Sequence, residues 1–267
     1  MKNIIVIPAR YNSSRFPGKP LALIKGKSLI FRTWSIAKQV KEIDDVYVTT
    51  DHADIRAHAL DFGAKVIMTG DCQNGTERVF KAAKSLKIHD NDRIINLQGD
   101  AVLTPPWAIQ SLVDRMKNDY LTIGTLAVKI TQNEYATMQA TKNKGNVGGS
   151  MVVFDTKYNA LYFSKRMIPY LRDSTIENPP IYRHIGLYAY CFSLLSNYAS
   201  LPPTVLEQAE GLEQLRALEN GIPIRVVIVN YKGRTHASID SPGDIEQVER
   251  IIDKETELVS FTNTSGI

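Results

Sequence analysis

Short apolar runs alternate with helix-like segments through the first half of the chain, and this alternation constrains the fold more than any other feature. The runs are short and nearly uninterrupted, as in strands that are buried on both faces of a sheet. Strands are expected at 4–7, 46–50, 65–68, 93–97 and 123–128, with helices at 28–40, 54–60, 76–86 and 106–116. Such strand–helix repetition predicts right-handed βαβ units and a mostly parallel sheet.

The second half of the chain departs from this regular pattern. The alternation loosens from about 130 to 180, and 141–149 is loop-like. Further strands are expected at 151–154, 160–163, 182–192 and 224–229, with helices at 212–219 and 245–252. The sequence shows neither an internal repeat nor a linker. We therefore predict one α/β domain over 1–255 with a small inserted lobe at about 130–200, followed by a flexible tail at 256–267.

Composition narrows the classes of protein to which the chain can belong. A hydrophobic fraction of 43%, a charged fraction of 22% and a formal charge of +4 are ordinary for a globular protein and give nucleic-acid binding no support. No apolar stretch of the sequence approaches the roughly 18 residues of a membrane span. Cys72 and Cys191 form neither a CxxC pair nor a zinc pattern. These features predict a cytoplasmic protein without membrane or nucleic-acid partners.

A polar loop at 8–20, directly after the first expected strand, is the strongest local signal of chemistry. In parallel sheets, ligands bind beyond the carboxyl ends of the strands. The loop carries Arg10, Arg15 and Lys19 among small residues, so backbone amides and basic side chains can wrap a triphosphate. It contains neither GxxxxGK[ST] nor GxGxxG. From composition alone, a phosphate-binding loop and a solvated basic loop fit these residues equally well.

Short motifs occur in order along most of the chain. They are PARYNSSRFPGKPL at 8–21, TDH at 50–52, NGTER at 74–78, NLQGD at 96–100, ALYFS at 160–164, RHIGLY at 183–188 and LEQLR at 212–216. Together they resemble the motifs of the CMP-3-deoxy-manno-octulosonate (CMP-Kdo) synthetases, cytidylyltransferases that supply Kdo for lipopolysaccharide and capsule. The resemblance implies a Rossmann-like, glycosyltransferase-A-like nucleotidyltransferase fold, a three-layer α/β/α sandwich. It also implies a homodimer that uses CTP and an acidic sugar as substrates and releases pyrophosphate.

The resemblance also implies roles for individual residues. Arg10 and Lys19 hold phosphates and Asp100 and Asp240 ligate Mg²⁺, so these four are the expected catalytic residues. The expected nucleotide-binding residues are Ala9, Ser13, Ser14, Arg15, Thr50, Asp51, Asn74, Gly75, Thr76, Arg78 and Gln98. The expected contacts of the sugar acid are Lys165, His184, Tyr188, Glu213 and Gln214.

Ordinary structural roles also fit several of these residues. Asp100 suits a turn, Asp240 suits the N-terminal cap of the last helix, and Thr76 suits the cap of the helix that starts beside it. His184 and Tyr188 are four apart on a strand and project from the same face, which suits either a polar wall or a half-buried strand. The resemblance favours the functional role.

Several positions depart from the family pattern. Ala101 follows the QGD motif where Glu is usual, Lys165 replaces an Arg, and Met151 replaces a Lys. Within the resemblance, these departures imply either a variant acid, such as 8-amino-Kdo, or a Kdo pocket that has drifted. Activation of sialic acid, a sugar-1-phosphate nucleotidylyltransferase and a CTP-binding protein without turnover are the competing functions.

Overall fold

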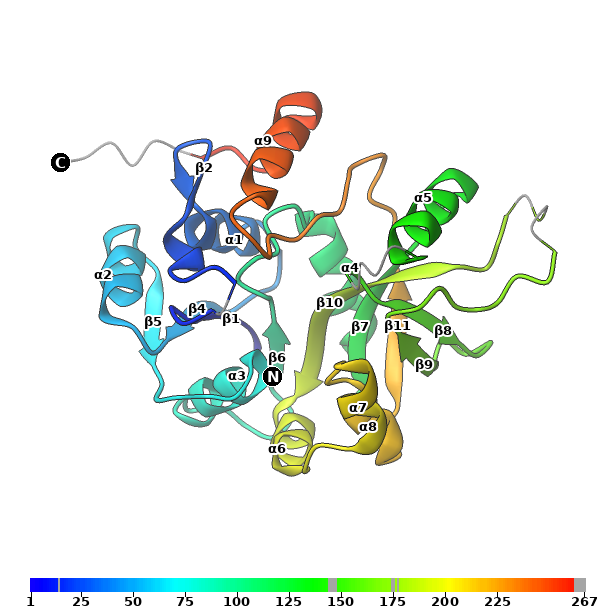
Figure 1. The fold of residues 1–267 in the computed structure, drawn as a ribbon. Helices are drawn as coiled ribbons and strands as arrows, with labels where there is room; N and C mark the ends of the chain where they lie inside the picture. The colour runs from blue at the N-terminus through cyan, green and yellow to red at the C-terminus, as the bar shows by residue number, and fades with distance from the viewer. Residues whose placement is uncertain (14, 144–147, 174–175, 177, 262–267) are drawn as a thin grey trace.

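The computed structural model describes residues 1–267 except 14, 144–147, 174–175, 177 and 262–267, and the described residues form a nine-stranded sheet flanked by helices (Figure 1). The main path of the sheet is β11 (Ile224–Ile228), β7 (Ile123–Lys129), β10 (Tyr182–Cys191), β6 (Arg93–Asn96), β1 (Asn3–Ala9), β4 (Asp45–Thr50) and β5 (Lys65–Met68). The pair β8 (Met151–Phe154) and β9 (Ala160–Ser164) extends it from β10. Strands along the main path are parallel except β10, which runs antiparallel to β6 and β7. The predicted mostly parallel α/β sheet is confirmed.

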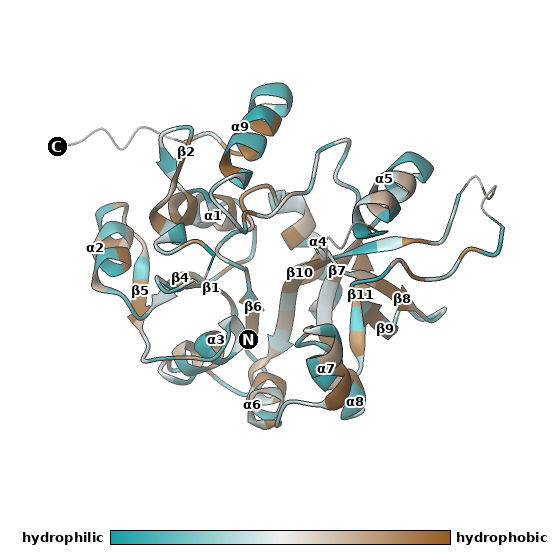
Figure 2. Ribbon diagram, in the orientation of Figure 1, coloured by the Kyte–Doolittle hydropathy of each residue, from teal (hydrophilic) through white to brown (hydrophobic). Residues whose placement is uncertain are grey.

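Side-chain alternation on the strands builds a hydrophobic layer on each face of the sheet. On β1, Ile5 and Ile7 point to one face, and Ile4 and Val6 point to the other. The helices over the first face are α1 (Leu29–Ala37), α2 (Ala53–Asp61) and α4 (Pro106–Met116). Those over the second face are α3 (Gly75–Lys84), α6 (Phe192–Ser200) and α8 (Leu215–Glu219). The result is a three-layer α/β/α sandwich whose strands are the more apolar layer in Figure 2.

The caps of two helices near the site differ from those considered from the sequence. The Asn74 side chain accepts a hydrogen bond from the Glu77 amide at 2.8 Å and so caps α3. Thr76, expected as this cap, lies instead within the first turn of α3 and is 5% exposed, so the capping interpretation is wrong. The last helix is α9 (Asp244–Glu255), and its cap is Gly243 rather than Asp240. The capping role considered for Asp240 is therefore also wrong.

Three helices and a short hairpin escaped prediction. They are α5 (Gln132–Asn143), α6, α7 (Val205–Glu210) and the hairpin of β2 (Leu23–Ile24) with β3 (Lys27–Ser28), which follows a 3₁₀ turn at Lys19–Leu21. Helix α5 overlaps the loop expected at 141–149, of which 144–147 lie outside the described residues. Only Tyr135 and Met138 of α5 join a small apolar cluster, so no apolar stripe marks this helix in the sequence. The helix expected at 212–219 begins only at Leu215.

The C-terminal segment is packed further than expected. Glu257 pairs with the buried guanidinium of Arg32, and Val259 is 7% exposed. The Phe261 ring lies 5.6 Å from that of Phe31 on α1. The flexible tail predicted from residue 256 is thus wrong as far as Phe261, and the rest lies outside the described residues. The division into a domain and a lobe at about 130–200 stays a prediction, and no described helix has both the length and the apolarity to cross a bilayer.

Candidate active site

Several cavities lie beside an interruption in the sheet along one edge of β10. β6 ends at Asn96, which pairs with Tyr188. β8 joins β10 again at Tyr182 and Arg183, while β7 occupies the opposite edge. Between the contacts with β8 and β6, the edge of β10 that faces β6 is not paired with any described strand. In the same stretch, the register of β10 against β7 shifts after Ile185. The loops that follow β1 and β6 meet at this gap.

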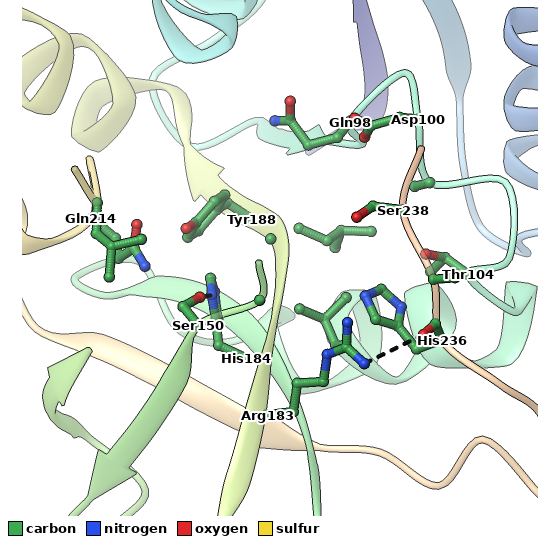
Figure 3. Close-up of a pocket in the computed structure, with 17 residues that line it drawn as sticks. Gln98, Asp100, Thr104, Ser150, Arg183, His184, Tyr188, Gln214, His236 and Ser238 are labelled. Carbon is green, nitrogen blue, oxygen red and sulfur yellow. Dashed lines mark hydrogen bonds between the residues drawn. The ribbon is translucent and has the colours of Figure 1, made fainter. Parts of the chain in front are cut away.

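Three cavities surround the gap. We call them the β1 cavity (about 180 Å³), the β10 cavity (about 270 Å³) and the α8 cavity (about 230 Å³). Gln98 lines all three, and Asp100 lines the first two. Figure 3 shows the β10 cavity, with Gln98 and Asp100 on one side and Arg183 and His184 on the other. Molecules bound in the β1 and β10 cavities would therefore meet at Gln98 and Asp100.

Charged groups dominate the β1 cavity. Lys19 Nζ lies 2.6 Å from Asp100 Oδ2 and 2.6 Å from the carbonyl oxygen of Ile239. Arg15 Nη2 lies 3.1 Å from Asp240 Oδ1. These pairs hold two acidic and two basic side chains in the lining of one cavity. When a ligand binds, these ion pairs can open. The basic side chains can then bind a polyanion and the acidic ones a cation.

Other residues of the β1 cavity leave a free basic group and open space for a ligand. Arg10 has no hydrogen bond or ion pair with any described residue, so its guanidinium is available to a ligand. Arg78 is held by Asp51, with Nη2 and Oδ2 2.5 Å apart. A Cβ on Gly75 would lie 3.2 Å from Gln98 Oε1, so the glycine leaves room for the Gln98 side chain beside α3.

His184 forms a neutral, fixed part of the β10 cavity. Its Nε2 lies 3.0 Å from Thr125 Oγ1 and its Nδ1 lies 2.9 Å from Ser150 Oγ. Burial lowers the pKa of His184 to about 3. The Tyr188 ring lies 5.7 Å from the imidazole. Both roles considered from the sequence therefore apply to His184. It is a buried histidine whose two ring nitrogens are hydrogen-bonded, and it also lines a cavity.

The α8 cavity places a buried carboxyl group among tyrosines. Burial raises the pKa of Glu213, and the tyrosines beside it are Tyr188, Tyr190 and Tyr198. Gln214 is 6% exposed, and its buried Nε2 has no hydrogen-bond partner. An exposed helix surface, the ordinary structural role that the sequence also allows for Glu213 and Gln214, is therefore wrong. Both residues present polar groups that a hydroxylated ligand can satisfy.

The structure brings together most of the residues named from the sequence. Those that line the three cavities are Ala9, Arg10, Ser13, Arg15, Lys19, Asn74, Gly75, Thr76, Arg78, Gln98, Asp100, His184, Tyr188, Glu213, Gln214 and Asp240. Thr50, Asp51 and Lys165 line none of them, and Asp51 acts through Arg78. The Lys165 amide instead donates to Glu210 Oε2 at 2.9 Å. Its contact with the sugar stays a prediction, and Ser14 lies outside the described residues.

Sequence reasoning missed part of the β10 cavity. Its wall includes Thr104, Ser150, Arg183, His236 and Ser238, none of which was named as a site residue. Arg183 could have been found, because it opens the RHIGLY motif.

Two of the positions that depart from the family pattern have different surroundings. Ala101 lines the β10 cavity, so the change there alters its wall. Met151 is fully buried in an apolar cluster with Ile130 and Ile181 and lines no cavity near the gap. Of the two, only Ala101 can contact a ligand directly.

Asp100 and Asp240 fit a cation that takes part of its coordination from a bound nucleotide. Asp100 and Asp240 both line the β1 cavity. Among the described residues, no cluster of three or more His, Cys, Asp or Glu side chains is arranged to hold a metal ion. Two carboxylates together with phosphate oxygens are a donor set that suits Mg²⁺, which keeps few protein ligands. The residues therefore fit a metal that arrives with a nucleotide.

Comparison with known proteins agrees with this geometry. A family model described as cytidylyltransferase matches residues 4–226. The 3-deoxy-manno-octulosonate cytidylyltransferase of Maricaulis maris is 47% identical over 97% of this chain and 100% of its own length. The chain belongs to this cytidylyltransferase family. The 8-amino-3,8-dideoxy-manno-octulosonate cytidylyltransferase of Shewanella sp. is 40% identical over 94% of the chain and 98% of its own length.

Solved structures extend the comparison to the fold. A CMP:2-keto-3-deoxy-manno-octonic acid synthetase complexed with CTP is 37% identical, with a TM-score of 0.83, and the match covers 96% of this chain and 100% of that one. A 4-diphosphocytidyl-2C-methyl-D-erythritol synthase, 15% identical with a TM-score of 0.59, shares the fold alone. The family assigned from the motifs is thus confirmed, and the protein is a nucleotidyltransferase.

Gly99 of the cytidylyltransferase lies between Gln98 and Asp100, the two residues that line both the β1 and the β10 cavity. Replacing it tests whether the backbone of this turn must keep its position. A Cβ at this position would lie 2.7 Å from the Pro8 carbonyl oxygen, so the 98–100 turn must shift in Gly99→Ala. We expect the free energy of unfolding to fall by about 1–3 kcal/mol and turnover to fall with it, because Gln98 and Asp100 move. Urea unfolding and pyrophosphate release measure the two effects. Gly70→Ala is the matched control, since a Cβ there meets nothing within 4 Å, and equal losses in both variants would contradict the expectation.

The buried histidines of the cytidylyltransferase predict how its stability depends on pH. Burial lowers the pKa of His184 to about 3, and burial together with the charge of Arg183 does the same for His236. Both bind protons more weakly when folded than when unfolded, so their contribution is present above pH 6.5 and is lost as pH falls from 6.5 towards 3. Between pH 7.5 and 5.5 we expect a loss of about 1.4 kcal/mol for each histidine.

Urea unfolding at the two pH values measures this loss. His236→Gln should remove about half of it, whereas the control His89→Gln, at an exposed position, should leave it unchanged. An equal loss in wild type and His236→Gln would show that His236 takes no part.

Proposed function

We propose that this cytidylyltransferase joins CTP to Kdo or a closely related 3-deoxy-ulosonic acid, giving the CMP-sugar and pyrophosphate. The wall shared by the β1 and β10 cavities carries the proposal. A triphosphate in the basic β1 cavity and a polyhydroxylated acid in the β10 cavity would approach each other at Gln98 and Asp100. The names of the similar proteins support the choice of substrates.

The proposed reaction is a direct displacement at phosphorus. The anomeric hydroxyl of the acid attacks the α-phosphorus and gives up its proton to solvent, the bond from the α-phosphorus to the oxygen that bridges to the β-phosphate breaks, and pyrophosphate leaves towards Arg10 and Lys19. Such transfers depend on positioning and charge stabilisation and need no covalent nucleophile. Mg²⁺, held by Asp100 and Asp240, would neutralise charge on the phosphate oxygens. Gln98 and Gln214 supply amide groups that orient the acid.

The test is pyrophosphate release with CTP and Mg²⁺, with Kdo, 8-amino-Kdo and N-acetylneuraminate assayed side by side. Turnover with Kdo would indicate that the change at Ala101 is tolerated. Turnover with 8-amino-Kdo alone would make Ala101 a determinant of specificity. Binding of CTP without turnover on any of the acids would contradict the proposal. Replacing CTP by UTP tests the base, and omission of Mg²⁺ tests the metal.

The setting of this activity is also part of the proposal. We infer a cytoplasmic homodimer whose product serves lipopolysaccharide or capsule synthesis. Exposed apolar side chains in or next to the proposed lobe, namely Leu161, Tyr170 and Val205, support self-association. Sedimentation equilibrium gives the mass in solution directly, and a monomer at micromolar concentration would contradict this inference.

A further inference from the structure

Arg183 is a largely buried arginine without a carboxylate partner among the described residues. Its Nε is buried and makes no hydrogen bond. Its one hydrogen bond runs from Nη1 to the His236 carbonyl oxygen at 3.4 Å, near the limit of such bonds. Burial lowers the pKa of Arg183, and Glu134 acts on it through its charge without a hydrogen bond to it. The Glu134 carboxylate already accepts from the Thr131 amide at 2.7 Å.

The other buried arginines show how this chain normally treats such a group. Each has a carboxylate or several carbonyl partners: Arg32 with Glu257, Arg78 with Asp51, Arg216 with Glu207, and Arg93 with the carbonyls of Met116 and Lys117. Guanidinium groups offer five donors in a planar fork, and leaving them unpaired in a buried place is costly. Unlike these arginines, Arg183 has no group among the described residues that satisfies the donors of its buried guanidinium, and a bound anion would supply one.

The surroundings of Arg183 keep its guanidinium open towards the β10 cavity. A Cβ on Gly149 would lie 3.4 Å from Arg183 Nε, and the backbone there has a φ of +68°, which favours glycine. In Figure 3 the Arg183 side chain rises from β10 between His184 and His236. Both imidazoles are neutral at pH 7, and Asp100, the acidic side chain that lines this cavity, is already paired with Lys19. The cavity thus carries an unbalanced positive charge.

We propose that the Arg183 guanidinium binds the carboxylate of the acidic sugar and so selects an acid over a neutral sugar. This assignment rests on the proposed function. A planar carboxylate matches the geometry of the planar guanidinium and can accept hydrogen bonds from the N–H groups that the protein leaves unpaired. In a 2-ulosonic acid the carboxylate is bonded to the anomeric carbon, so fixing the carboxylate also restrains the hydroxyl that reacts.

The test compares binding of the acid with binding of a neutral analogue in wild type and in two variants. Wild type, Arg183→Gln and Arg183→Lys are titrated calorimetrically with Kdo and with its C1 amide, after saturation with a CTP analogue that has a methylene between the α- and β-phosphates. We expect Arg183→Gln to bind Kdo on the order of 100-fold more weakly and the amide within about threefold of wild type. Arg183→Lys keeps the charge but loses the fork, and we expect about a tenfold loss for Kdo alone.

A second arginine controls for the loss of charge as such. Arg225→Gln removes a mostly buried arginine that pairs with Asp119 outside the three cavities, and it should leave both affinities unchanged. Equal weakening of acid and amide in Arg183→Gln would mean a structural role and would overturn the assignment, as would unchanged binding of Kdo. If Arg183→Gln does not fold, Arg183→Lys decides by the same comparison. Failure of wild type to bind Kdo, 8-amino-Kdo or N-acetylneuraminate would overturn the proposed function and, with it, this role.

Discussion

Replacing Asp100 by Asn is expected to lower the rate of pyrophosphate release by about 10²–10³-fold while CTP still binds. Asp100 lines both the β1 and the β10 cavity, so its carboxylate lies where the two substrates would meet. Asparagine keeps the shape but loses the charge that a metal requires. Binding of CTP should change only a few-fold, because Arg10, Asn74 and Gly75 remain. Single-turnover kinetics and calorimetric titration with CTP separate the two effects.

Stability distinguishes this loss from misfolding. Asp100 pairs with Lys19, and the two side chains are 27% and 18% exposed, so losing the pair should cost no more than about 1 kcal/mol. The matched control is Asp114→Asn, which removes a surface carboxylate paired with Lys117 and should leave turnover unchanged. Turnover in Asp100→Asn within tenfold of wild type would remove Asp100 from the catalytic residues.

The regular half of the fold was predictable because short apolar runs mark its strands and apolar residues at helical spacing mark its helices. Strand β5 and helix α4 begin and end where the apolar pattern places them. Helix α6 was lost because Phe192, Leu194 and Leu195 continue the apolar run of β10, and nothing in the sequence marks the change of period at Cys191. Helix α5 was lost for the opposite reason, since its mostly polar sequence packs through few side chains.

The candidate site also has a part that the sequence predicts and a part that it does not. Its nucleotide half follows from chain order, because loops after parallel strands lie at one edge of the sheet and the 8–20 and 96–100 motifs occupy two such loops. The β10 half depends on tertiary structure. The cavity exists because β10 runs antiparallel past the end of β6 and meets β8 only at Tyr182 and Arg183. That interruption, and with it the exposure of Arg183 and His236 to one cavity, cannot be derived from local pattern.

Replacing Lys19 by Met should move two properties in opposite directions. The Lys19 ammonium group sits between the Asp100 carboxylate and the Ile239 carbonyl, where it provides a positive charge to oxygens that suit a cation. Without it, we expect the nucleotide-free protein to bind Mn²⁺ roughly tenfold more tightly. Turnover should nevertheless fall about 100-fold, because a charge that would stabilise the departing pyrophosphate is gone. Electron paramagnetic resonance of free Mn²⁺ measures the first effect, and pyrophosphate release measures the second.

The opposite signs make this result hard to obtain by damage to the fold, which would weaken metal binding and turnover together. Lys25→Met is the matched control, since Lys25 Nζ pairs with Asp253 Oδ1 at 2.6 Å on the surface, and neither property should change. In wild type, addition of CTP should strengthen Mn²⁺ binding, because the phosphates attract Lys19 away from Asp100 as they bring their own oxygens. If Lys19→Met binds Mn²⁺ no better than wild type, then Lys19 does not compete with the metal. The Asp100 pair would then be one among many surface contacts.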